Sequence, residues 1–106
     1  MTGAEFRQLR QDLSEALGRE LSMADMAKLC GLPAAGGLVT VRRWEVTGPG
    51  EPVAKLLAVL AMASDRHPIL DEFNVFDRYD VPVSDRPARK QAFREKMRDD
   101  VRRRLG

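Results

Sequence analysis

Apolar residues recur at spacings of three and four along most of the chain, which is the period of an amphipathic helix. The first such stripe consists of Phe6, Leu9, Leu13 and Leu17. Thr2 and Glu5 have the spacing of a capping box, in which each side chain pairs with the other residue's backbone N–H. Gly18 suits the left-handed residue that follows many helices. The pattern therefore predicts a helix over residues 3–17.

A second, shorter helix is predicted over residues 23–30. Ser22 is a favourable N-cap, and Asp25 places a negative charge near the positive end of the helix. Gly31 ends the helix. The buried face is expected to consist of Met26, Leu29 and Cys30.

A third helix is predicted over about residues 38–46. Leu38, Val41 and Trp44 lie three residues apart and form its expected apolar edge. The glycines at 36 and 37 disfavour an earlier start, since each costs about 1 kcal/mol relative to Ala inside a helix. The segment is also rich in β-branched residues, namely Val39, Thr40, Val41 and Val46, so a strand remains the alternative.

Two more helices and a connector are predicted in the second half of the chain. Pro52 suits the first turn of a helix that ends near Ser64. Residues 77–87 contain two prolines and are interpreted as an extended connector, and residues 87–105 are predicted to form an amphipathic helix with a basic outer face. Its apolar positions are Ala88, Ala92, Phe93, Met97, Val101 and Leu105. A short helix is also possible at Ile69, Leu70, Phe73 and Phe76.

Composition narrows the classes of protein to consider. The chain has 106 residues, 43% apolar and 32% charged, which is typical of one folded, soluble domain. The longest apolar run, 56–63, is too short to cross a bilayer, and the N-terminal residues lack the apolar core of a signal peptide. One cysteine excludes an internal disulfide and favours a reducing cytoplasm, where we expect the protein.

The chain offers little for catalysis or metal binding. Cys30 and His67 are the only residues of their types and have no neighbours at ligand spacing, so we expect no metal. We interpret Cys30 as a core residue and His67 as a loop residue. No nucleophile–base arrangement or phosphate-binding loop is evident, which predicts neither an enzyme nor a cofactor.

Charge is distributed unevenly along the chain. Residues 1–63 contain equal numbers of basic and acidic side chains, whereas residues 84–106 contain nine basic and four acidic ones. A basic segment of this kind favours a polyanion or an acidic protein surface as partner. A solvated helix face explains the same charges equally well.

Several short sequence motifs occur in a fixed order over residues 3–63. "EFRQLR" lies in the first helix, Ser22 opens the second, Ala27 and Gly31 stand four apart, "TVRRWE" ends the third helix, and "GEPVAKLL" follows. Together they resemble the Cro/phage-repressor-like (XRE-type) helix-turn-helix family of bacterial and phage DNA-binding proteins. The resemblance implies an all-α fold of four to five helices. Residues 1–64 would then form the DNA-binding domain, followed by a connector and a C-terminal basic amphipathic helix at 65–106.

The resemblance also suggests roles for individual residues. Ala27 would be the small contact between the two crossing helices and Gly31 the positive-φ residue of the turn. Val41 and Trp44 would be buried, and Arg10 would pair with Glu45. The expected DNA contacts are Ser22, Met23, Val39, Thr40, Arg42, Arg43 and Thr47. Among these, arginine can bind guanine through two hydrogen bonds, and valine can contact a thymine methyl group.

The sequence departs from the family in two places. Gly31 and Val41 are ten positions apart, about four more than is usual for a helix-turn-helix. The two glycines within residues 33–37 favour a longer turn over a longer helix. The family's usual glutamine after the N-cap is replaced by Met23, so a phosphate contact there would fall to a backbone N–H.

We therefore expect a sequence-specific, DNA-binding transcriptional regulator that represses by binding an inverted repeat as a homodimer. The C-terminal helix has two possible roles. It could build the dimer through Phe93, Met97, Val101 and Leu105, or its arginines could flank the DNA. The alternative function is an antitoxin or adaptor that binds a protein partner through residues 84–106.

Overall fold

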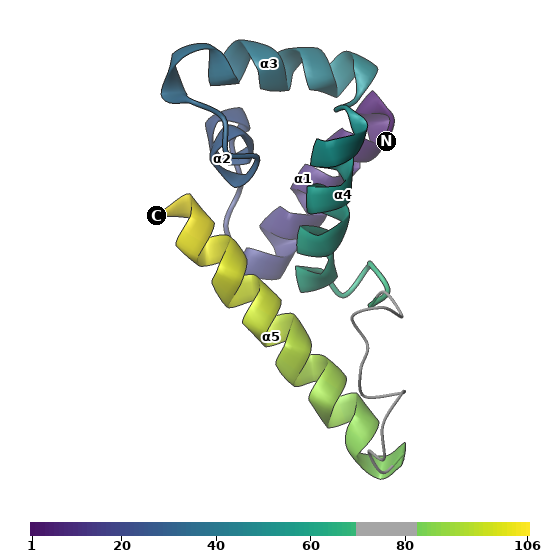
Figure 1. Cartoon of the computed structure of the whole chain (residues 1–106). Coiled ribbons are helices and arrows are strands. Elements are labelled where there is room, and N and C mark those ends of the chain that lie inside the picture. The colour runs from purple at the N-terminus through teal and green to yellow at the C-terminus, as the bar shows by residue number, and fades with distance from the viewer. Residues whose placement is uncertain (70–82) are drawn as a thin grey trace.

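The computed structural model describes residues 1–69 and 83–106, and these ranges contain helices and no strand. The α-helices are α1 (Gly3–Leu17), α2 (Met23–Leu29), α3 (Ala34–Thr47), α4 (Glu51–Leu60) and α5 (Arg86–Leu105), with single 3-10 turns η1 (Ala61–Ala63) and η4 (Val83–Asp85). Figure 1 shows α3 across one end of the molecule and α5 running obliquely past α1, α2 and α4. The expected all-α class is confirmed, and the strand alternative for 38–46 is wrong.

The first two helices begin at the predicted N-caps, Thr2 and Ser22. Thr2 Oγ1 accepts a hydrogen bond from the Glu5 backbone N–H, and Glu5 Oε1 accepts one from the Thr2 N–H, each at 3.0 Å. Ser22 and Asp25 pair in the same way at the start of α2. Gly18 adopts the predicted left-handed conformation with φ of 69°. Local sequence therefore sets these boundaries, although α2 ends one residue earlier than predicted.

The turn between α2 and α3 is longer than a tight helix-turn-helix turn. Gly31 has φ of 71°, as expected. Further along, Ala35 (φ −74°, ψ 118°) and Gly36 (φ 83°, ψ −13°) interrupt the helical geometry at the start of α3. These angles match the central residues of a type II turn, whose second position favours glycine. Regular helix follows from Gly37, so the additional residues lengthen the turn, as the two glycines predicted.

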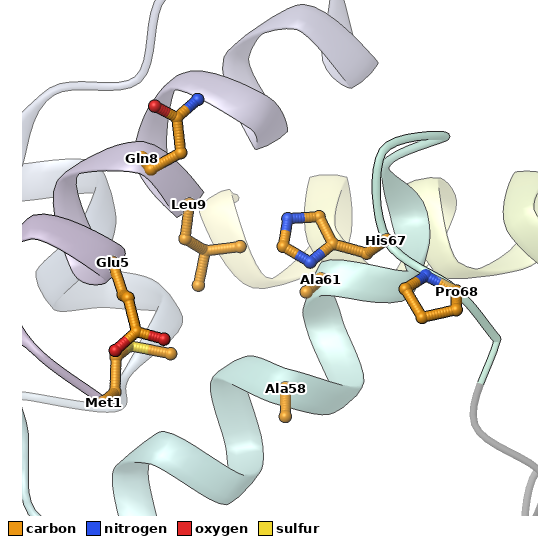
Figure 2. A pocket seen from close by; sticks show the side chains of 8 residues that line it. All are labelled: Met1, Glu5, Gln8, Leu9, Ala58, Ala61, His67 and Pro68. Atoms are coloured by element: carbon orange, nitrogen blue, oxygen red, sulfur yellow. The ribbon is translucent and has the colours of Figure 1, made fainter.

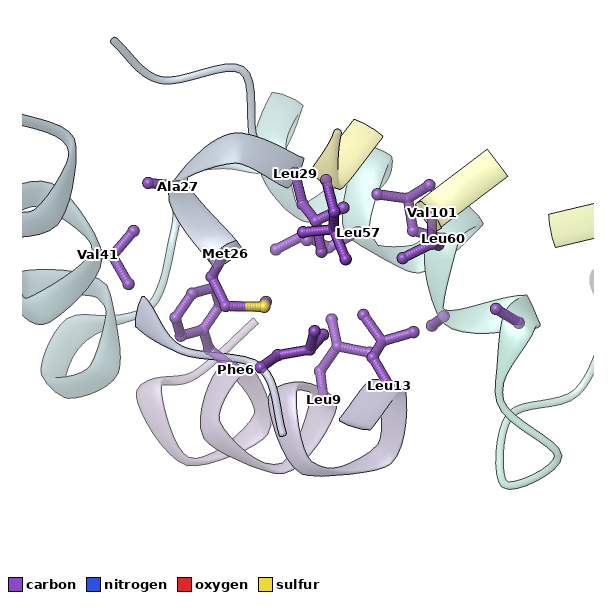
Figure 3. Close-up of a cluster of buried hydrophobic side chains, with 14 of the residues drawn as sticks. Phe6, Leu9, Leu13, Met26, Ala27, Leu29, Val41, Leu57, Leu60 and Val101 are labelled. Carbon is purple, nitrogen blue, oxygen red and sulfur yellow. The ribbon is translucent and has the colours of Figure 1, made fainter. Parts of the chain in front are cut away.

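The core lies between α1, α2, α4 and the C-terminal half of α5. Figure 3 shows Phe6, Leu9 and Leu13 of α1 facing side chains that include Leu57, Leu60 and Val101. Trp44 of α3 closes one end, with its ring centroid 6.1 Å from that of Phe6 in an edge-to-face arrangement. The prediction that Trp44 is a core residue is confirmed.

The expected apolar edge of α3 is wrong at one residue. Leu38 is 38% exposed, and the buried position near it belongs to Gly37. A Cβ on Gly37 would lie 3.3 Å from the Cβ of Ala27 on α2. The two small residues let the helices approach closely, which turns the buried face of α3 toward Gly37 and leaves Leu38 at its margin.

Helix α5 belongs to the same core as the first four helices. Met97, Val101 and Leu105 are buried and Phe93 packs against the core, so the face considered for a dimer contact is occupied within the chain. Met97 and Val101 are a helical turn apart, as predicted. The extended connector predicted over residues 77–87 is wrong for residues 83–85, which form a 3-10 turn. The possible helix at Leu70, Phe73 and Phe76 lies outside the described residues.

Two arginines of α5 hydrogen-bond the end of η1. Arg94 Nη1 donates to the carbonyls of Met62 and Ser64, at 2.9 and 2.7 Å, and Arg98 Nε donates to that of Ala63 at 2.8 Å. These carbonyls lie where a helix end leaves its acceptors without intrahelical partners. Part of the basic charge of α5 therefore supports the fold. Among the described helices, none is both long and apolar enough to cross a membrane.

The N-terminus of α1 packs directly on the C-terminal backbone of α3. A Cβ added to Gly3 would lie 2.6 Å from the carbonyl oxygens of both Glu45 and Val46. That is far inside van der Waals contact, and the obstacle is backbone that cannot rotate away. A glycine at this position is therefore required for α3 to lie as close to α1 as it does.

We expect Gly3→Ala to lower the free energy of unfolding by about 1–3 kcal/mol, because the added methyl forces α1 and α3 apart. Urea denaturation followed by circular dichroism measures this change. Gly50→Ala is the matched control, since no atom lies within 4 Å of its added Cβ. Equal stability of the two variants would contradict the close contact.

Candidate nucleic-acid interface

Helix α3 has a buried side and an outward side with distinct side chains. The buried residues are Gly37, Val41, Trp44 and Glu45. The outward residues, Val39, Arg42, Arg43 and Val46, follow the i, i+3, i+4, i+7 spacing of one helical stripe. Val39 is 68% and Val46 79% exposed. This outward stripe includes three of the residues predicted to contact DNA.

The two arginines of the stripe are exposed, and neither guanidinium group makes a hydrogen bond or ion pair with any residue in the described ranges. Other arginines are engaged within the fold. Arg19 pairs with Asp25 at 3.0 Å, and Arg102 and Arg103 pair with aspartates one helical turn earlier on α5. Arg42 and Arg43 thus keep their guanidinium donors for an external acceptor.

The single carboxylate of α3 is turned away from this stripe. Glu45 is 9% exposed, and its Oε1 lies 3.1 Å from Nη2 of Arg10 on α1. Arg10 Nη1 also donates to the Leu21 carbonyl at 3.3 Å. The predicted Arg10–Glu45 pair is confirmed as a close ion pair, although Glu45 Oε1 accepts no well-aligned hydrogen bond. The outward stripe is consequently cationic, with no acid of its own helix beside it.

The two threonines predicted as DNA contacts flank the stripe. The Thr40 hydroxyl donates to the Gly36 carbonyl at 3.2 Å, and the Thr47 hydroxyl donates to the Arg43 carbonyl at 3.1 Å. A hydroxyl has a single proton, so in this geometry each side chain offers an external partner its acceptor lone pairs. Thr47 is exposed and Thr40 half-buried.

The predicted contacts at the start of α2 have structural roles. The exposed Ser22 uses its hydroxyl as the N-cap, accepting from the Asp25 N–H at 3.1 Å. The half-buried Met23 packs its side chain against the core. Burial raises the pKa of Asp25, but the hydrogen bonds from Ser22 and the nearby Arg19 outweigh it, so the pKa is lowered overall. The carboxylate therefore remains charged and holds the start of α2.

A contact between Asp12 and His67, which the sequence did not predict, joins α1 to the loop after η1. The buried Asp12 lies with its Oδ2 2.9 Å from Nε2 of His67, and its Oδ1 accepts from Gln8 Nε2 at 3.0 Å. His67 is in a loop, as predicted, but it is engaged there. The position of Asp12, between the apolar Leu9 and Leu13 in the helical stripe, was the signal that it would face inward.

His67 also lines a pocket of about 310 Å³ between α1 and α4. Figure 2 shows its ring reaching toward Leu9 of α1, with Ala58 and Ala61 on the same side of the pocket as His67. The carboxylate at the rim belongs to Glu5, whose pKa is lowered by the hydrogen bonds from Thr2 in the capping box. Within residues 1–69 and 83–106, no three His, Cys, Asp or Glu side chains are grouped to hold a metal.

The lone cysteine is packed against the core, as predicted. Burial raises the pKa of the Cys30 thiol to about 11. The side chain therefore stays a neutral thiol near pH 7 and behaves as a small apolar group.

Comparisons of the chain with protein-family models, with curated proteins and with solved structures found no match. The assignment of a function therefore depends on the geometry of α3 and on the motif residues themselves.

We expect Arg10→Met to destabilise the protein by about 1–3 kcal/mol, because it leaves the Glu45 carboxylate buried without its counter-charge. Glu45→Gln should restore part of that loss when combined with it. Urea denaturation of the two single variants and the double variant gives the coupling energy, which we expect to exceed about 1 kcal/mol. The exposed Glu51–Lys55 pair, at 3.7 Å, is the control and should couple by less than about 0.5 kcal/mol. Additive effects at Arg10 and Glu45 would refute the pair's role.

Proposed function

We propose that the protein is a sequence-specific DNA-binding transcriptional regulator whose α3 enters the major groove of duplex DNA. The observation that carries this proposal is the outward stripe of α3, which presents two unengaged arginines while the helix's one carboxylate is held by Arg10. A polyanion with hydrogen-bond acceptors suits this surface, and duplex DNA offers both in its phosphates and in guanine O6 and N7.

The placement of α3 supports the same proposal. The helix lies across one end of the molecule, with its outward side facing away from the other helices (Figure 1). The major groove is about 12 Å wide and admits one α-helix. Helix α2, seen nearly end-on in the same view, crosses beneath α3 at a wide angle, an arrangement used by helix-turn-helix proteins. We assign α2 and α3 to such a motif of the Cro/repressor-like type, with a lengthened turn.

The other parts of the chain have supporting roles in this proposal. Ser22 and Met23 position α2, and Thr40 and Thr47 offer acceptors at the edge of the groove. The arginines of α5 add long-range attraction to DNA, weakened locally by their pairing with Asp99 and Asp100. We propose that the protein acts in the cytoplasm as a repressor, binding as a homodimer to inverted half-sites about one DNA turn apart.

The test is selection of bound duplexes from a random pool, followed by titration of the enriched duplex. We expect Arg42→Ala/Arg43→Ala to weaken binding of that duplex at least about tenfold, because each two-bond contact to guanine contributes about 1–3 kcal/mol. Fluorescence anisotropy measures the affinity, and circular dichroism checks the fold.

Arg102→Ala/Arg103→Ala is the matched control, because it removes the same charge from exposed positions on α5. It should lower affinity for enriched and unrelated duplexes alike, and preserve the preference between them. A folded Arg42→Ala/Arg43→Ala variant that keeps full preference for the enriched duplex would refute the proposal, as would a pool from which nothing is enriched.

A further inference from the structure

Within the part of the chain that the structure describes, the exposed large apolar side chains are concentrated on one helix. Among the described residues, the large hydrophobic side chains that are exposed are Met1, Leu38, Val39 and Val46. Three of the four belong to α3, although that helix already buries Val41 and Trp44 on its other side. Exposed apolar residues are ordinary when scattered singly, but two of these, Val39 and Val46, share the outward stripe with the two unengaged guanidinium groups.

Val39 and Val46 lie at the two ends of the outward stripe, with Arg42 and Arg43 between them. Seven residues at the helical rise of 1.5 Å separate the two valines by about 10 Å along the axis. Base pairs are about 3.4 Å apart along the axis of a DNA duplex, so this spacing spans at most about three base-pair steps. Both valines can therefore meet the floor of the groove on either side of the base pair that an arginine reads.

The chemistry of the groove floor identifies what the valines would contact. The 5-methyl group of thymine is the apolar group that base pairs present in the major groove. The isopropyl group of valine packs against such a methyl and removes both from water. A protein partner with an apolar surface is less suitable, because it would have to desolvate two adjacent guanidinium groups that have no partner within the described fold.

We propose that the outward stripe of α3 selects duplex sites in which thymines lie on both sides of a guanine, within about three base-pair steps of each other. Val39 packs on one thymine methyl, Val46 packs on the other, and Arg42 or Arg43 binds the guanine between them. This inference rests on the proposed DNA-binding function and specifies its sequence preference.

The experiment uses the full chain and two random duplex pools, one made with thymine and one with deoxyuridine in its place. Deoxyuridine pairs identically but lacks the methyl group. We expect the thymine pool to enrich a guanine flanked by thymines. Replacing either flanking thymine by deoxyuridine in the enriched duplex should weaken binding about threefold to fivefold, as expected for one buried methyl group.

Two variants assign each methyl contact to its valine. Val39→Ala should lose the sensitivity to deoxyuridine at one flanking position, and Val46→Ala at the other. Both side chains are exposed, so neither change should affect folding. Leu38→Ala is the control, because Leu38 lies at the margin of the helix beside α2 and should leave both sensitivities unchanged.

The outcomes separate this inference from the function on which it rests. If a duplex is enriched and depends on Arg42 and Arg43, but deoxyuridine binds as well as thymine at every position, the thymine contacts are refuted and DNA binding stands. If the two valine variants keep the full deoxyuridine effect, the assignment of the methyl contacts to these valines is refuted. If neither pool yields an enriched duplex, both proposals fail.

Discussion

The ion pair between Arg10 on α1 and Glu45 on α3 is the interaction on which the candidate DNA-binding face depends. It fixes the rotation of α3 about its axis, since Glu45 can reach Arg10 only when Val41 and Trp44 face the core. It also places the single carboxylate of α3 beside a cation of another helix. The same contact therefore positions the outward stripe and removes from it the one charge that would repel a polyanion.

Small residues make this arrangement sterically possible. Gly3 lets the start of α1 meet the last turn of α3, and Gly37 lets the first turn of α3 meet Ala27. Helix α3 is thus held by a close contact near each end, and Val41 and Trp44 pack into the core between these contacts. A helix held in this way can present long polar and apolar side chains outward without relying on them for its own position. Arg94 and Arg98 hold α5 against η1 in a different way. Their guanidinium groups donate hydrogen bonds to carbonyls at the end of η1.

The features that the sequence predicted correctly are those governed by neighbours in the chain. The capping box at Thr2, the N-cap at Ser22 and the positive φ at Gly31 depend on residues within four positions, and each is present. The sequence predicted Leu38 on the buried side of α3, whereas the structure places Gly37 there. Both positions fit the helical period, and only the contact with Ala27 decides between them. The pairing of Asp12 with His67 joins residues 55 positions apart, a distance at which periodicity and capping rules contain no information. The Arg10–Glu45 pair was predicted from the resemblance and is confirmed, whereas the DNA contacts proper stay predictions.

The most direct test of the account is an amide-resolved NMR titration of the full chain with a duplex enriched from a random pool. The account predicts that the largest chemical-shift changes fall on residues 39–47 of α3 and on the turn before it. Residues of α5 should respond weakly, and less still as the salt concentration is raised, since they contribute long-range attraction alone. Changes concentrated on α5, with α3 unaffected, would contradict the central claim that the outward stripe of α3 is the surface that reads DNA.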